Sequence, residues 1–399
     1  MIRTPGKAPR RPSQALLLAL LASALAPGAA EAVVVMARKG EKRAELLEKA
    51  HQFGLAHPWV VGLRFSAKDE MLQTATGAFL GVGPDGRTGH VLTAAHVIIR
   101  DLHKQELRLP ARFEIVFGPA LNRFNPSNGV KFQADRIHVH PGFQIFQDAS
   151  LPPRRGKKVA QTLARNDLAV IRFDLGPGGA ALLAARGIEP ARLYDGAGFR
   201  TPLREAAIVG YGLSGTTKDL HLEASGRIHG GRTKVTYGTW RGLTGFLHWS
   251  PVSAEATAAS RKSNFCQCDP TPRRNYVDPV THGFIPVESH PEQVLGNFGD
   301  SGGPLILFTR RGPEVAGIYS AFNNDRLPSY FTGAEVNPGK LHYQYWVPVK
   351  EHLGWIRPVM GMKEGKASEA RVIDLTGGPV DLRKWGIFRE METKEEKKG

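Results

Sequence analysis

Short apolar runs separated by turn residues fill the chain from residue 57 to residue 356. Most runs have roughly four to eight residues and are bounded by Gly, Pro, Asn or Asp, the pattern of short strands joined by tight turns. The expected strands are 59–65, 76–82, 90–93, 112–117, 136–140 and 168–173 in the first half, and 206–210, 227–237, 304–309, 315–322 and 345–348 in the second. This spacing predicts an all-β antiparallel sandwich or barrel.

Three polar side chains stand beside such runs. His96 ends Leu92-Thr93-Ala94-Ala95-His96, Asp167 precedes the apolar 168–171, and Ser301 lies in Gly299-Asp300-Ser301-Gly302-Gly303-Pro304. Each alone has an ordinary structural explanation, as a core histidine, a turn aspartate or a glycine-rich loop. Together they supply the base, the orienting carboxylate and the alcohol that make a serine nucleophilic at neutral pH.

The order His, Asp, Ser along the chain, with these flanking residues, resembles that of the trypsin/chymotrypsin-like serine proteases of the bacterial, exported type. Two further stretches resemble the same family. Val209-Gly210-Tyr211-Gly212 is similar to a turn in its second barrel, and 346–356 is similar to its last strand and C-terminal helix. The resemblance covers about residues 57–357. It implies two antiparallel six-stranded β-barrels, a short C-terminal helix and an active site between the barrels.

The resemblance also implies residue roles. His96 would be the general base, Asp167 would orient it, and Ser301 would attack the substrate carbonyl. The N–H groups of Gly299 and Ser301 would form the oxyanion hole, which needs backbone donors and therefore tight glycine turns. In the family, the acid at the position of Asp300 often pairs with a new N-terminus made by zymogen cleavage. The usual Ile-Val-Gly-Gly start is missing here, so we expect a hole that folds constitutively.

Substrate preference is indicated by three positions. Leu295 stands where trypsin-like members carry an aspartate that binds basic side chains, so a preference for Lys or Arg is not expected. Ser320 and Phe322 belong to 317–322, which resembles the strand that pairs with the substrate backbone. The bulk of Phe322 favours small apolar side chains in the substrate.

The N-terminus predicts export. Four basic residues are followed by the apolar stretch 15–26 and by Ala30-Glu31-Ala32, which together indicate a signal peptide over residues 1–32. The apolar stretch is shorter than the roughly 20 residues that span a bilayer. Removal of residues 1–32 takes away four basic residues and one acidic residue, which changes the net charge from +16 to +13. No basic run is interleaved with aromatic residues, so nucleic acid is not an expected partner. The signal peptide predicts a secreted or periplasmic protein without a stable membrane anchor. The resemblance implies an enzyme that acts on a protein or peptide substrate.

The two cysteines, Cys266 and Cys268, are separated by one residue and lie far from His96 and Ser301 in sequence. A bond between them would close a small, strained ring. Two thiolates are too few for a structural zinc site, although His248 or His282 could complete one. A surface pair, free or oxidised, is the simpler expectation, and neither a metal nor a cofactor is expected.

The chain is expected to divide into four parts: the signal peptide, an N-terminal leader and helix at 33–56, the protease-like domain at 57–357, and a charged flexible tail at 358–399. Long insertions are expected at 141–158 and 250–291. Two other functions stay open, an esterase or acyl hydrolase that uses the same three residues, and a protease-like binding module without activity.

Overall fold

A computed structural model describes residues 34–35, 42–66, 73–99, 106–107, 112–121, 129–148, 161–196, 204–212, 215–216, 226–240, 243–251, 294–296, 299–322, 341–361, 371–377 and 380–389. The expected signal peptide, both cysteines and nearly all of the expected insertion at 250–291 lie outside these residues. No helix in the described ranges is long and apolar enough to cross a membrane.

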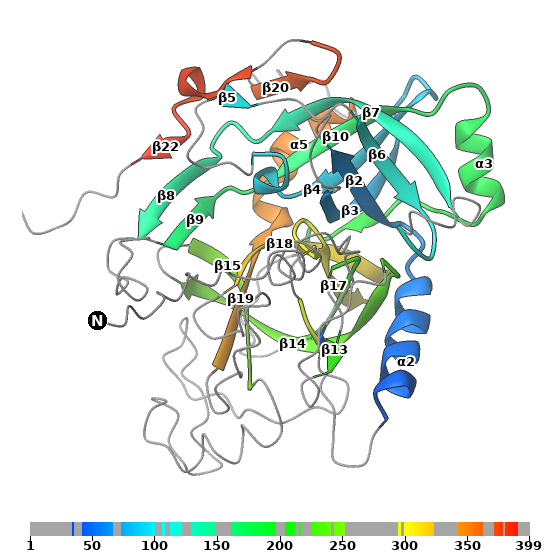
Figure 1. Ribbon diagram of the computed structural model, residues 1–399, viewed down its shortest axis with the longest axis vertical. Coiled ribbons are helices and arrows are strands. Elements are labelled where there is room, and N and C mark those ends of the chain that lie inside the picture. The colour runs from blue at the N-terminus through cyan, green and yellow to red at the C-terminus, as the bar shows by residue number, and fades with distance from the viewer. Residues whose placement is uncertain are drawn as a thin grey trace, which may run out of the picture.

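The first half of the chain forms a closed six-stranded antiparallel barrel (Figure 1). The strand order is β10-β4-β3-β2-β6-β7, and pairing of β10 with β7 closes the barrel. The strands are β2 (Val60–Ser66), β3 (Gln73–Val82), β4 (Thr88–Thr93), β6 (Arg112–Phe117), β7 (Val130–Val139) and β10 (Ala169–Asp174). The inward side chains, among them Phe79, Phe117 and Phe173, are buried and pack ring against ring. This barrel and the mostly-β class confirm the sequence-based expectation.

The second half forms a seven-stranded sheet in the order β11-β18-β17-β12-β14-β15-β19, in which β18 also pairs with β19. The strands are β11 (Arg192–Leu193), β12 (Arg204–Gly210), β14 (His229–Trp240), β15 (Leu243–Pro251), β17 (Pro304–Thr309), β18 (Gly312–Phe322) and β19 (Leu341–Pro348). This sheet contacts the barrel where β12 and β17 meet β3 and where β18 meets β4. Helix α3 (Gly179–Ala185) lies in the connection between the two halves.

The N-terminal segment packs on the second sheet. Helix α2 (Arg43–Leu55) is built from good helix formers, and Leu46 and Ala50 on one face are buried. His51 anchors the helix because its Nδ1–H donates to the carbonyl of Ile228 at 2.6 Å. Ahead of the helix, β1 (Val34–Val35) lies between β13 (Gly215–Thr216) and β16 (Val294–Leu295) in a small sheet.

The C-terminal region corrects one expectation. After η3 (Val349–His352) and α5 (Leu353–Val359), residues 371–389 were expected to be part of a flexible tail, yet they fold onto the first barrel. We call them the C-terminal strap. Its Ile373, Leu382 and Ile387 are buried, and burial of these apolar side chains holds it in place.

The strap contributes three short strands. Strand β20 (Arg371–Asp374) continues the barrel at the part of β7 that β6 does not reach, β21 (Val380–Asp381) pairs with β5 (Glu106–Leu107), and β22 (Phe388–Arg389) pairs with β8 (Gln144–Asp148). Strand β8 forms a hairpin with β9 (Gln161–Arg165), and η4 (Leu382–Trp385) joins β21 to β22.

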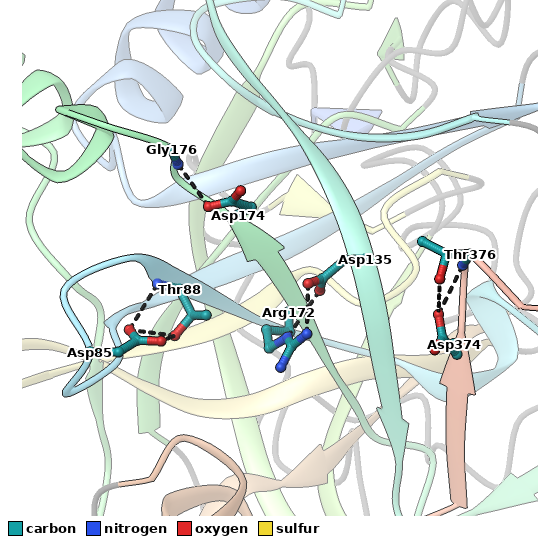
Figure 2. A network of polar contacts seen from close by, with 8 residues as sticks. All are labelled: Asp85, Thr88, Asp135, Arg172, Asp174, Gly176, Asp374 and Thr376. Carbon is teal, nitrogen blue, oxygen red and sulfur yellow. Dashed lines mark hydrogen bonds and ion pairs between the residues drawn. The ribbon is translucent and has the colours of Figure 1, made fainter.

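Hydrogen bonds and an ion pair join polar side chains on the outer face of the barrel near the strap (Figure 2). Arg172 of β10 donates two hydrogen bonds to the carboxylate of Asp135 on β7, at 3.0 and 2.7 Å. Asp374 of β20 accepts hydrogen bonds from the N–H and hydroxyl of Thr376, which closes a turn within the strap. These pairs are partly or fully exposed, so each adds little stability.

Candidate active site

His96 and Asp167 come together because the strands that carry them are neighbours. His96 lies in the single turn η1 (Ala95–Val97) just after β4, and Asp167 lies just before β10. Strands β4 and β10 pair with Thr93 opposite Ala169, so the end of one strand meets the start of the other. Asp167 accepts both the backbone N–H of His96, at 2.8 Å, and the Nδ1–H of its ring, at 2.6 Å.

This double contact defines the chemical state of the imidazole. Because Nδ1 carries a proton toward the carboxylate, Nε2 of neutral His96 is left as a hydrogen-bond acceptor. The His96 side chain is 26% exposed, whereas that of Asp167 is fully buried. His96 can therefore exchange a proton with a bound molecule while its orienting partner stays shielded from water.

A third donor reaches Asp167 from the second sheet. Ser320 of β18 donates its hydroxyl to Oδ2 of Asp167 at 2.6 Å. The buried carboxylate thus accepts hydrogen bonds from a backbone amide, an imidazole and a hydroxyl, which compensates for its loss of hydration. Burial, and to a smaller extent the charge of Asp167, raises the pKa of the neighbouring Tyr345. Ser320, expected as a substrate-binding residue, is shown here in contact with Asp167.

The backbone around Ser301 is held from both halves of the molecule. The N–H of Thr76 on β3 donates to the Ser301 carbonyl at 3.0 Å, and the N–H of Gly302 donates to the Tyr319 carbonyl on β18 at 2.9 Å. Gly302 has φ +79°, and a Cβ on it would lie 1.9 Å from Oγ1 of Thr93 and 2.9 Å from the backbone nitrogen of Ala94. Only glycine allows this approach, which brings the Ser301 turn against the segment that leads into His96.

The backbone preceding Ser301 is equally constrained. Gly299 has φ +88°, and a Cβ on it would lie 2.7 Å from the Cα of Gly212. Thr76 fixes this segment because its hydroxyl donates to the Gly299 carbonyl and accepts the N–H of Tyr211, both at 3.0 Å. No described residue accepts a hydrogen bond from the N–H of Gly299 or Ser301. That these two N–H groups form an oxyanion hole stays a prediction.

Asp300 is fully buried, and its carboxylate contacts the end of β12. Its Oδ1 accepts the N–H of Gly212 at 2.9 Å, next to the turn at Tyr211. The side chain packs so closely on β12 that a Cβ on Gly210 would lie 2.2 Å from Oδ1. Asp300 therefore ties the Ser301 turn to the end of β12.

One buried polar cluster beside this turn was missed by the sequence analysis. Gln344 of β19 is 1% exposed, and its side-chain amide donates to the Gly296 carbonyl at 2.6 Å and to the Tyr319 hydroxyl at 3.3 Å. The Gly296 N–H donates back to Gln344 at 3.3 Å, and a Cβ on Gly296 would lie 3.1 Å from the Tyr319 ring. The signal that could have revealed this cluster is Gln344 itself, a polar residue within the mostly apolar strand β19.

Two other expected residues are placed only by their backbones. Leu295 belongs to β16 and pairs with Val34, and Phe322 ends β18, where it pairs with Gln344. Both therefore lie on strands that border the Gln344 cluster. Within the described part of the chain, no group of three or more His, Cys, Asp or Glu side chains could hold a metal ion.

The closed barrel is compatible with a chymotrypsin-like fold. No protein-family model matches the chain, and no curated protein sequence matches it.

Proposed function

We propose that this chain is an exported serine endopeptidase of the trypsin/chymotrypsin-like type, with His96, Asp167 and Ser301 as its catalytic residues. The observation that carries the proposal is the fully buried Asp167 that accepts both N–H groups of His96. A histidine held in one tautomer by a buried carboxylate, with its second nitrogen free to accept a proton, is the arrangement of a general base.

The proposed reaction proceeds in two halves. Oγ of Ser301 attacks the carbonyl carbon of the peptide while Nε2 of His96 takes the hydroxyl proton. The negative oxygen of the tetrahedral intermediate accepts hydrogen bonds from the N–H groups of Gly299 and Ser301. His96 then gives its proton to the departing amine as the C–N bond breaks. Water next adds to the acyl-enzyme with the same base, which releases the acid and restores Ser301.

Pairings in the second sheet support the two-barrel architecture that this function implies. Strand β18 pairs with β17 on one side and with β19 on the other. The turn at Tyr211 and the closing segment β19, η3 and α5 coincide with the two stretches that resemble the family. The proposed active site lies where β3 and β4 face β12, β17 and β18.

The Gln344 cluster supports a preference for small substrate side chains. It lies on the second-sheet side of the Ser301 turn. Two of its members are close to site residues in the sequence: Gly296 is five residues before Ser301, and Tyr319 directly precedes Ser320. Gln344 and Tyr319 are each 1% exposed, and we propose that their side chains narrow the substrate-binding space on this side. The substrate residue that donates the scissile carbonyl is therefore proposed to be small, such as Ala, Ser or Gly.

Labelling with a fluorophosphonate tests the proposal directly, because this reagent phosphonylates a serine that an adjacent base activates. We expect stoichiometric labelling of the mature protein at Ser301 and none in Ser301→Ala or His96→Ala. Ser214→Ala, a serine outside the catalytic motifs, serves as the matched control. A peptide library and a panel of simple esters, assayed in parallel, separate endopeptidase from esterase activity. Absence of labelling in the folded wild-type protein contradicts the proposal.

A further inference from the structure

A tight turn formed by residues 140–143, between β7 and β8, lies directly beside Asp167. The N–H of His140 donates to the Leu168 carbonyl at 3.0 Å, and the N–H of Phe143 closes the turn on the His140 carbonyl at 2.9 Å. Asn166 donates its side-chain amide to the Gly142 carbonyl at 2.9 Å. The 140–143 turn thus contacts the residues on both sides of Asp167.

Asn166 has an unusual backbone conformation. Its φ of +50° is the only positive φ at a non-glycine residue in the described part of the chain. Left-handed φ is uncommon for residues with a Cβ, Asn is one of the residue types that adopt it most readily, and surrounding contacts help to hold it. The hydrogen bond from Asn166 to Gly142 is such a contact. Displacement of the 140–143 turn would therefore remove hydrogen bonds that hold the residues on both sides of Asp167.

The closing helical segment holds this turn from one side. Nδ1 of His140 accepts the N–H of Gly142 at 3.0 Å, so the proton of a neutral His140 ring is on Nε2. That nitrogen lies 3.1 Å from Nδ1 of His352 in η3 and donates to it. Burial lowers the pKa of His140 to about 3 and that of His352 to about 4, so both rings are neutral near neutral pH. The Trp355 ring packs edge-on against His140, with ring centres 4.9 Å apart.

The C-terminal strap holds the same turn from another side. Arg371 at the start of β20 donates to the Phe143 carbonyl at 2.7 Å and to the Trp385 carbonyl at 2.5 Å. The N–H of Ile145, two residues after the turn, donates to the Ile387 carbonyl at 2.8 Å. One guanidinium therefore ties the strap to itself and to the turn beside Asp167.

We propose that Arg371 and His352 are positioning residues, which act through the 140–143 turn and Asn166 to hold the Asp167 carboxylate on His96. The C-terminal strap is then a built-in clamp on the catalytic site as well as an added edge of the barrel. The inference depends on the proposed function, because Asp167 matters to catalysis only if His96 is a base. A purely structural strap would stabilise the barrel without changing the contact between His96 and Asp167.

The experiment compares four variants of the full mature protein. Arg371→Met keeps the aliphatic stem and removes both donors, and Arg371→Lys restores one donor. His352→Leu removes the acceptor for His140, and His352→Asn restores it near the position of Nδ1. Thr376→Ala is the matched control because Thr376 lies in the same strap and, among the described residues, its N–H and hydroxyl donate to Asp374 alone.

Turnover and structure are measured together, well below each melting temperature. We expect kcat to fall by about 10–100-fold in Arg371→Met and His352→Leu, with KM within about twofold, because small displacements of catalytic groups cost this much. Arg371→Lys and His352→Asn are expected to recover part of the loss. The downfield proton signal of the His96 Nδ1–H, observed by NMR, is expected to shift or vanish in the two weak variants and to persist in Thr376→Ala.

Each outcome is decisive. If Arg371→Met and His352→Leu are folded and keep both the kcat and the proton signal of Thr376→Ala, the clamp is refuted. If one of them does not fold, the partial-restoration variant at that position carries the same comparison against Thr376→Ala. If the wild-type protein neither labels nor hydrolyses, the proposed function fails, while the proton signal still tests whether the strap holds Asp167 on His96.

Discussion

Replacing Asp167 by asparagine tests the proposed base most severely, because the two side chains have nearly the same shape. The carboxylate accepts three hydrogen bonds, with Oδ1 facing the His96 backbone and Oδ2 facing both the His96 ring and Ser320. Asparagine has a single oxygen. If that oxygen faces the ring, its NH₂ group meets the backbone N–H of His96. If the amide turns over, its NH₂ group meets Nδ1, which must then give up its proton to Nε2, and His96 can no longer act as a base.

The expected magnitude follows from these contacts. If His96 keeps the tautomer that can act as a base, its buried backbone N–H loses its acceptor, which costs about 1–3 kcal/mol. The charge-assisted hydrogen bond to the imidazolium, worth about 1.5–3 kcal/mol, is lost as well. Together these terms raise the barrier by roughly 3–6 kcal/mol, which corresponds to about a 10²–10⁴-fold loss of kcat. KM is expected to change little, because Asp167 is fully buried and does not touch the substrate.

The assay is hydrolysis of a peptide chosen from the library, with thermal unfolding recorded for each variant. Asp174→Asn is the matched control: Asp174 ends the strand that Asp167 precedes, and in the described part of the chain its carboxylate accepts the N–H of Gly176 alone (Figure 2). Its activity should equal that of the wild type. If Asp167→Asn retained a tenth or more of wild-type kcat while folded, the assignment of His96 as a base oriented by Asp167 would be wrong.

Three further predictions concern other parts of the structure. Gly302→Ala adds a Cβ 1.9 Å from Oγ1 of Thr93 at a left-handed φ, so we expect a loss of activity and a destabilisation of roughly 1–3 kcal/mol or more in urea unfolding, and an unchanged midpoint would contradict the geometry. Gln344→Gly empties the space beside Gly296, so cleavage profiles should broaden toward larger side chains, while an unchanged profile would remove Gln344 as a specificity determinant. Burial lowers the pKa of His352 and His229 to about 4 each, below the value of about 6.5 in an unfolded chain. Stability should therefore be full above pH 6.5 and fall between pH 6.5 and 4, by up to roughly 1.4 kcal/mol per pH unit for each histidine, and a flat urea midpoint over this range would refute it.

Local patterns in the sequence were enough to predict the strands that build the barrel. The expected strand at 59–65 corresponds to β2 (Val60–Ser66), and the one at 168–173 corresponds to β10 (Ala169–Asp174). Alternation of apolar and polar residues and the turn residues between them are properties of neighbouring positions. Chain order and flanking residues likewise sufficed to predict that His96 and Asp167 meet, and the structure confirms that contact.

Contacts between distant strands could not be predicted in the same way. Ser320 meets Asp167 across 153 positions, and Gln344 meets Gly296 across 48, so neither pair leaves a periodic signal. The C-terminal strap could not be predicted from the sequence for another reason. Strands β21 and β22 have two residues each, and lysines and glutamates surround them, so composition indicated a solvated tail. Pairing with β5 and β8 supplies the order that such short segments lack alone.

Thr76 connects the two halves of the molecule through several hydrogen bonds. This single buried residue contacts the carbonyls of Gly299 and Ser301, the N–H of Tyr211 and the hydroxyl of Thr93. Thr76 therefore joins the two halves of the chain beside the proposed catalytic residues, and a hinge motion at this place would break several of these hydrogen bonds at once. If the proposed function is correct, substrate binds to a surface whose backbone these contacts already hold in place.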